Sequence, residues 1–156
     1  IPLRLVGSEM CIRDRIGIVG AGVRGGFGAA HATLPSMPAP LIWHITEQAA
    51  WETAVRRGEY TQSTRGRDLA EVGYIHAAWP EQISLVALKA YPDRPDGLVI
   101  LEIDVARVEA AQVAVDIEAD PHGGRGWPCI RGALPISAVL RLRRTRWIGR
   151  EFVVVA

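Results

Sequence analysis

Among the segments that have a strand-like pattern, LVILEID at residues 98–104 is the most apolar, and it predicts the central strand of a sheet. Two helical patterns precede it, whereas strand patterns dominate after it. The helices are expected at residues 47–57 and 81–90, and the later strands at 112–118, within 133–147 and at 151–155. Early helices and late strands predict an α+β fold with antiparallel strands, not a doubly wound parallel sheet.

The other elements are short and bounded by turn residues. LIWHIT at 41–46 and YIHAA at 74–78 are rich in β-branched and aromatic residues, so both predict strands. Thr46 is in position to cap the helix that follows, and Gly58 is in position to end it. Residues 58–68 are mostly polar and are predicted to form a loop.

Length and charge limit the class of protein. The 156 residues suffice for one domain with a buried core, and 49% hydrophobic and 22% charged residues are ordinary for a soluble globular protein. The net charge of +1 gives no general attraction to nucleic acid or to an anionic membrane, so neither is expected as a partner. No segment reaches the roughly 18 apolar residues of a membrane span. Two cysteines cannot build a disulfide framework, so a reducing cytoplasm is the expected location.

The stretch IGIVGAGVRGG at residues 16–26 contains glycines in the G-x-G-x-x-G spacing of a dinucleotide-binding turn. Such a turn must open a helix whose N-terminus faces the pyrophosphate, but more glycines and then Pro35 interrupt that helix. No second parallel strand–helix–strand unit follows. We therefore interpret residues 1–40 as a Gly/Pro-rich leader and residues 41–156 as a single α+β domain, with a Rossmann domain and a signal peptide as the alternatives.

The segment LVGSEMCIRDR at residues 5–15 resembles the translated sequencing-adapter read-through found at the ends of environmental gene predictions. This resemblance implies that residues 1–15 are not native to the protein. Cys11 would then have no role in the fold.

Two histidines, His44 and His76, lie on predicted strands among polar neighbours. An imidazole in such a place can exchange a proton near neutral pH, or it can serve as a hydrogen-bonded structural group. We take both histidines as candidate catalytic residues, with the structural role as the alternative for each.

Further polar side chains gather in the predicted loop STRGR at residues 63–67. The hydroxyl of Ser63 and the guanidinium groups of Arg65 and Arg67 suit a phosphate or a carboxylate, with an ordinary solvated loop as the alternative. The arginines of RLRRTR at residues 141–146 alternate between two faces, which favours a solvated edge strand over a nucleic-acid site. Histidines and cysteines at metal-ligand spacing do not occur, so no metal site is predicted.

Several motifs in a fixed order resemble the family called domain of unknown function 952, over about residues 41–147. They are His44-x-Thr46, Gly58-Glu59-Tyr60, Ser63-x-x-Gly66-Arg67, Glu71-x-Gly73-Tyr74-Ile75-His76, Gln82 and Leu101-Glu102-Ile103-Asp104. The resemblance implies a small ADP-ribosyltransferase-like fold, in which a split pair of sheets surrounds a cleft.

The same resemblance implies a binding site for NAD or another phosphorylated nucleotide. His44 and Thr46 match the positions that contact the ribose and the nicotinamide amide. The nicotinamide pocket would be lined by Tyr74, His76 and Trp79. Tyr60 and Ser63 belong to matching motifs and complete the predicted binding set, in which Arg65 and Arg67 neutralise phosphate.

Two departures from the family pattern bear on catalysis. Cys129 and Arg131 replace the histidine and tyrosine usual before the last strand, and no acidic residue lies between residues 126 and 150, where transferases of this superfamily commonly place a glutamate. Glu102 or Asp104 would have to serve instead. Two functions therefore stay open: a transferase or hydrolase that acts on NAD or nucleotides, and a binding module that has kept the fold without the chemistry.

Overall fold

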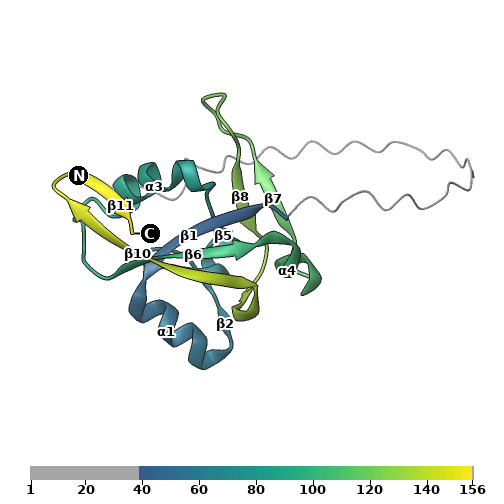
Figure 1. The fold of residues 1–156 in the computed structure, drawn as a ribbon. Helices are drawn as coiled ribbons and strands as arrows, with labels where there is room; N and C mark the ends of the chain where they lie inside the picture. The colour runs from purple at the N-terminus through teal and green to yellow at the C-terminus, as the bar shows by residue number, and fades with distance from the viewer. Residues whose placement is uncertain (1–38, 156) are drawn as a thin grey trace, which may run out of the picture.

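The computed structural model describes residues 39–155 (Figure 1). The glycine turn at residues 16–26, the adapter-like segment with Cys11 and nearly all of the predicted leader lie outside the described residues. Within them the protein combines helices with antiparallel strands, as predicted for a small α+β domain. No helix of residues 39–155 is long and apolar enough to cross a membrane.

The main sheet contains four antiparallel strands in the order β1-β6-β10-β11. They are β1 (Leu41–Glu47), β6 (Leu98–Asp104), β10 (Val139–Ile148) and β11 (Glu151–Val154). Every residue of β6 except Asp104 is buried, because β6 lies between β1 and β10 and is covered on both faces. The prediction of a central strand at residues 98–104 is therefore confirmed.

The register of the main sheet assigns its side chains to two faces. His44 pairs with Leu101 and Trp43 pairs with Glu102, so His44 and Glu102 lie on opposite faces. The face of His44 packs against α1 (Gln48–Arg57) and β2 (Glu59–Tyr60), and the opposite face packs against α3 (Ile83–Ala90). Two separate hydrophobic clusters result, one on each side of the sheet.

A second, three-stranded sheet has the order β5-β8-β7. Its strands are β5 (Ile75–His76), β8 (Trp127–Ile130) and β7 (Val115–Glu118). The two sheets meet where Trp43 of β1 and Ala78 exchange two backbone hydrogen bonds of 2.8 Å each. This seam joins the free edge of β1 to the end of β5 and positions the site described below.

The sequence patterns missed two elements of this region. β8 contains Pro128, whose ring nitrogen cannot donate a ladder hydrogen bond, and a proline normally argues against a central strand. Here β8 still pairs on both sides, and the carbonyl of Pro128 accepts from Ala77 N at 2.9 Å. The short helix α4 (Val105–Ala110) directly follows β6 and is capped by the side chain of Asp104.

The prediction of a polar loop at residues 58–68 is wrong. The segment forms β2, β3 (Gln62–Thr64) and β4 (Arg67–Asp68), and α2 (Leu69–Val72) follows. Tyr60 and Ser63 are buried and anchor these strands, a tertiary effect that local polarity does not reveal. β2 pairs with β9 (Leu134–Pro135), while β3 pairs with β4 around a turn at Gly66.

Of the two caps predicted for the first helix, the C-terminal one is confirmed and the N-terminal one is wrong. Gly58 ends α1 in the left-handed conformation, with φ +88°, as predicted. Glu47, not Thr46, is the N-cap, and the hydroxyl of Thr46 is engaged with Tyr60 instead. The predicted second helix begins with a short 3-10 turn at Pro80–Gln82 before α3, and another such turn, Ile136–Ala138, precedes β10.

The arginine-rich segment at residues 141–146 belongs to β10, which pairs with β6 over Val139–Arg144 and with β11 only over Thr145–Ile148, so Arg141 and Arg143 lie at a local edge of the sheet as predicted. Arg143 donates from Nε to Glu102 Oε2 at 2.6 Å, and its guanidinium lies over the ring of Trp43, 5.3 Å from the centroid. Glu102 is buried, so Arg143 compensates a carboxylate that has little access to water.

Replacing Arg143 with methionine is therefore expected to lower the free energy of unfolding by about 2 kcal/mol, because the buried carboxylate of Glu102 loses its partner. Arg143 is itself partly exposed, which keeps the loss below that of a fully buried pair. Urea denaturation measures the change, and the double variant Arg143→Met/Glu102→Gln should recover part of it. A loss no larger than that of Arg150→Met, on the exposed β10–β11 turn, would contradict the expectation.

Candidate functional site

A small pocket opens at the seam between the two sheets, with a cavity volume of about 30 Å³. Residues from β1, β3, β5, α3 and β8 surround it: Trp43, His44, Ile45, Ser63, Thr64, His76, Ala77, Ala78, Ile83, Val86 and Trp127. The cavity has room for only one or two water-sized groups, far less than a typical ligand pocket. Both candidate histidines line it, together with Ser63.

His44 is buried, and both of its ring nitrogens lie within hydrogen-bond distance of protein atoms. Nδ1 lies 2.5 Å from the carbonyl oxygen of His76, and Nε2 lies 2.8 Å from the Tyr60 hydroxyl. A carbonyl can only accept, so Nδ1 carries a proton. Burial lowers the pKa of His44 to about 4, so the ring is neutral near pH 7 and Nε2 accepts from the Tyr60 hydroxyl.

The network continues from Tyr60 to Thr46. The two hydroxyl oxygens are 2.9 Å apart, and both side chains are buried. Because Tyr60 gives its proton to His44, the hydroxyl of Thr46 is the donor to the Tyr60 oxygen. Burial also raises the pKa of Tyr60 well above its usual value, so the phenol keeps its proton. His44, Tyr60 and Thr46 thus satisfy one another inside the domain and leave no free group for a ligand.

His76, Ser63 and Thr64 form the polar part of the pocket that remains available. Ser63 Oγ lies 3.1 Å from His76 Nδ1, and no hydrogen bond within residues 39–155 engages His76 Nε2. The His76 ring lies against Tyr74, with the two centroids 4.8 Å apart. The guanidinium of Arg131 lies over the ring of Tyr74, 4.9 Å from its centroid, and forms ion pairs with Asp116 and Glu118. The arginine that departs from the family pattern therefore supports Tyr74, which in turn supports His76.

The other predicted binding residues lie away from the pocket lining. Arg65 forms an ion pair with Glu47 at 3.3 Å and another with Asp93, and it lies over the ring of Tyr91. Arg67 is exposed on β4. A phosphate near Arg65 would have to compete with two carboxylates that already neutralise its charge.

Trp79 also has a structural position. Its Nε1 donates to the carbonyl of Gly126 at 2.8 Å, and Arg125 lies over its ring at 3.6 Å from the centroid. These contacts hold the β7–β8 loop against the start of the second helical segment.

None of the pocket-lining residues described above is an aspartate or a glutamate. Glu102 lies on the face of the main sheet that carries Trp43, opposite to His44, and pairs with Arg143, and Asp104 caps α4. The two acids considered as substitutes for a catalytic glutamate are thus both engaged elsewhere. Within residues 39–155, no cluster of three His, Cys, Asp or Glu side chains could hold a metal ion.

No sequence pattern predicted the apolar wall of the pocket, which Trp43, Ile83, Val86 and Trp127 provide. Trp43 and His44 are consecutive residues of β1, so their side chains face opposite sides of the main sheet. Trp43 still lines the pocket, because the pocket lies at the free edge of β1 and adjoins both faces of that strand. No motif in the sequence marks Trp127 or Val86.

Fold and pocket together define a small α+β protein with a small pocket at the seam of two antiparallel sheets. The chain belongs to the family described as "Protein of unknown function (DUF952)", whose model matches residues 45–142. This confirms the family resemblance of its motifs.

Among solved structures, the chain is similar to protein CC0527 from Caulobacter crescentus. The crystal structure of CC0527 has a TM-score of 0.60 and 27% identity, over 74% of this chain and 93% of that one. Its solution NMR structure has a TM-score of 0.53 and 24% identity, over 72% and 90%. A comparison with curated proteins finds no match.

Proposed function

We propose that this protein is a binding module with an ADP-ribosyltransferase-like pocket, which holds the base end of a nucleotide such as NAD and does not catalyse transfer. The single observation that supports the proposal most is the lining of the seam pocket. It combines indole rings with Ser63 and His76, yet includes no carboxylate among the described residues. Stabilising an oxocarbenium-like transition state needs a negative charge close to the sugar, and this lining does not supply one.

The size of the pocket sets which part of the ligand enters. A cavity of about 30 Å³ takes a group such as a carboxamide, not a whole base with its ribose. A carboxamide offers one acceptor and two donors, which suit the Ser63 hydroxyl and the imidazole of His76. The aromatic ring that carries the carboxamide would then rest at the mouth, beside the apolar wall.

Calorimetric titration with NAD and with free nicotinamide tests the proposal. We expect saturable binding of both compounds, and a loss of affinity of about fivefold in Ser63→Ala, since one hydrogen bond contributes about 1 kcal/mol. Ser84→Ala, on the exposed side of α3, is the matched control and should bind as the wild type does. No binding of either compound at millimolar concentration would overturn the proposal.

Prolonged incubation with NAD separates the binding module from the enzyme. We expect no release of nicotinamide, as measured by chromatography, because the described pocket lacks an acid. Release by the wild type that is abolished in His76→Gln would favour the transferase or hydrolase instead.

A further inference from the structure

A second cavity lies between α1 and the short strands β2 and β3, and Tyr60 is part of its lining. Its volume of about 170 Å³ is much larger than that of the seam pocket. It still falls below the range of pockets for drug-sized molecules, so a ligand of only a few non-hydrogen atoms would fit.

Opposite charges line this second cavity. Arg57 is the last residue of α1, and Glu59 follows it directly after the turn at Gly58. Within residues 39–155 neither side chain forms an ion pair, with the other or with any third residue. Several exposed arginines of residues 39–155, such as Arg56 and Arg67, also form no ion pair, whereas carboxylates match the guanidinium groups of Arg65, Arg107, Arg125, Arg131 and Arg143.

Most of the remaining lining is polar, apart from Ala50, Ala54 and the ring of Tyr60. Asp68, the N-cap residue of α2, adds a second carboxylate, and its backbone N–H donates to Glu71 Oε2 at 3.0 Å. Thr53, Thr61 and Gln62 supply hydroxyl and amide groups that can both donate and accept. The cavity therefore offers one positive and two negative charges at different points of its wall, together with neutral hydrogen-bonding groups.

We infer that this second cavity binds a small α-amino acid. An ammonium group complements Glu59 and Asp68, and a carboxylate complements the guanidinium of Arg57. An inorganic anion alone would meet two carboxylates, and a simple amine would leave Arg57 unused. The inference is independent of the proposed nucleotide site, because it concerns a different cavity and a different class of ligand.

NMR titration of the isotope-labelled full chain tests this assignment. We expect glycine and L-serine to shift the amide resonances of residues 53–62 and 68 in a saturable way. Arg57→Gln and Glu59→Gln should each weaken binding about tenfold, the equivalent of about 1.4 kcal/mol for one lost charge contact. Both residues are exposed, so neither substitution should disturb folding.

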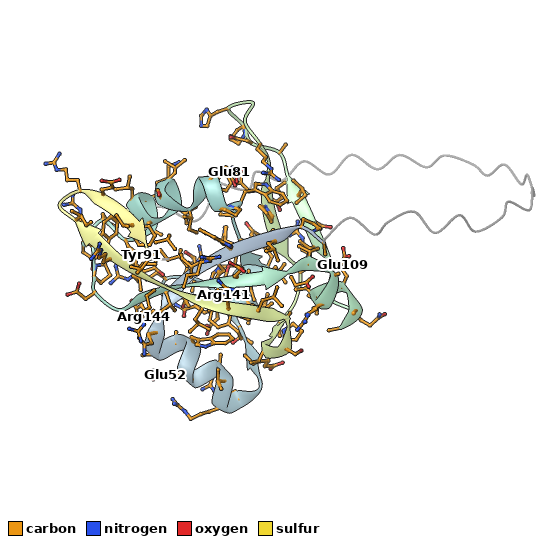
Figure 2. All side chains as sticks on the ribbon, in the orientation of Figure 1. Glu52, Glu81, Tyr91, Glu109, Arg141 and Arg144 are labelled. Carbon is orange, nitrogen blue, oxygen red and sulfur yellow. The ribbon has the colours of Figure 1, made fainter. Side chains whose placement is uncertain are left out.

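Two exposed charges remote from the cavity provide matched controls. Glu109→Gln on α4 and Arg150→Gln on the β10–β11 turn should leave the affinity unchanged; Figure 2 shows Glu109 at the right of the view, apart from Glu52 of α1 at the lower left. Ethanolamine, which lacks the carboxylate, and acetate, which lacks the ammonium, should bind at least tenfold more weakly. The inference is overturned if no saturable shift occurs, or if acetate or ethanolamine binds as well as glycine.

Discussion

Replacement of His44 with alanine is expected to lower the free energy of unfolding by about 4 kcal/mol. The substitution removes the donor to the part-buried His76 carbonyl and the acceptor for the buried Tyr60 hydroxyl, and it leaves both groups without that partner. Each unsatisfied buried group costs about 1–3 kcal/mol, and the lost imidazole leaves a cavity beside Tyr60. Urea denaturation followed by tryptophan fluorescence measures the change.

Three further variants distinguish the hydrogen bonds from the packing. His122→Ala removes an exposed histidine of the β7–β8 loop and should change stability by less than about 0.5 kcal/mol. His44→Asn can place an amide donor near the Nδ1 position, and His44→Gln can place an acceptor near the Nε2 position. Each should recover part of the loss. If all three His44 variants were as stable as the wild type, the network would not hold the seam together.

Acidification is expected to cost about 3 kcal/mol of stability through His44 alone. Burial lowers the pKa of His44 from 6.5 to about 4, so between these pH values the unfolded chain binds a proton at this residue that the folded protein does not. The free energy of unfolding therefore falls as the pH decreases from about 6.5 to about 4, and this contribution levels off below pH 4. Above pH 6.5 the neutral ring is favoured in both states and the full stability is present.

The difference in unfolding free energy between wild type and His44→Gln, measured at several pH values, isolates this contribution. Glutamine does not titrate, so its curve keeps only the effects of the other groups. Nitrogen-15 NMR of labelled histidine gives an independent readout, in which His44 should remain the neutral tautomer with the proton on Nδ1 at pH 5. A ring that becomes doubly protonated near pH 6.5 would contradict the assignment.

The local sequence pattern was sufficient to predict the elements whose own residues determine their conformation. Residues 98–104 form the central strand because almost every side chain there is apolar, and Gly58 ends α1 because it adopts a left-handed conformation without steric cost. β8 and the short strands after Gly58 escaped prediction for the opposite reason. Pro128 and the polar residues around Ser63 oppose a strand locally, and only contacts with distant segments stabilise them there.

The candidate site shows the same difference between what local motifs predict and what the tertiary structure determines. The sequence by itself determined the family, the α+β class and the residue types of the candidate site, since His44, Thr46, Tyr60, Ser63 and His76 all belong to short local motifs. Only the tertiary structure decided which of them can meet a ligand. Hydrogen bonds across the seam engage both nitrogens of His44, while Ser63 and His76 line the pocket and Arg65 is neutralised by Glu47 and Asp93. The physical reason is that burial and partners depend on strands 16 to 32 residues apart in the chain, and no local pattern encodes which polar group each one faces.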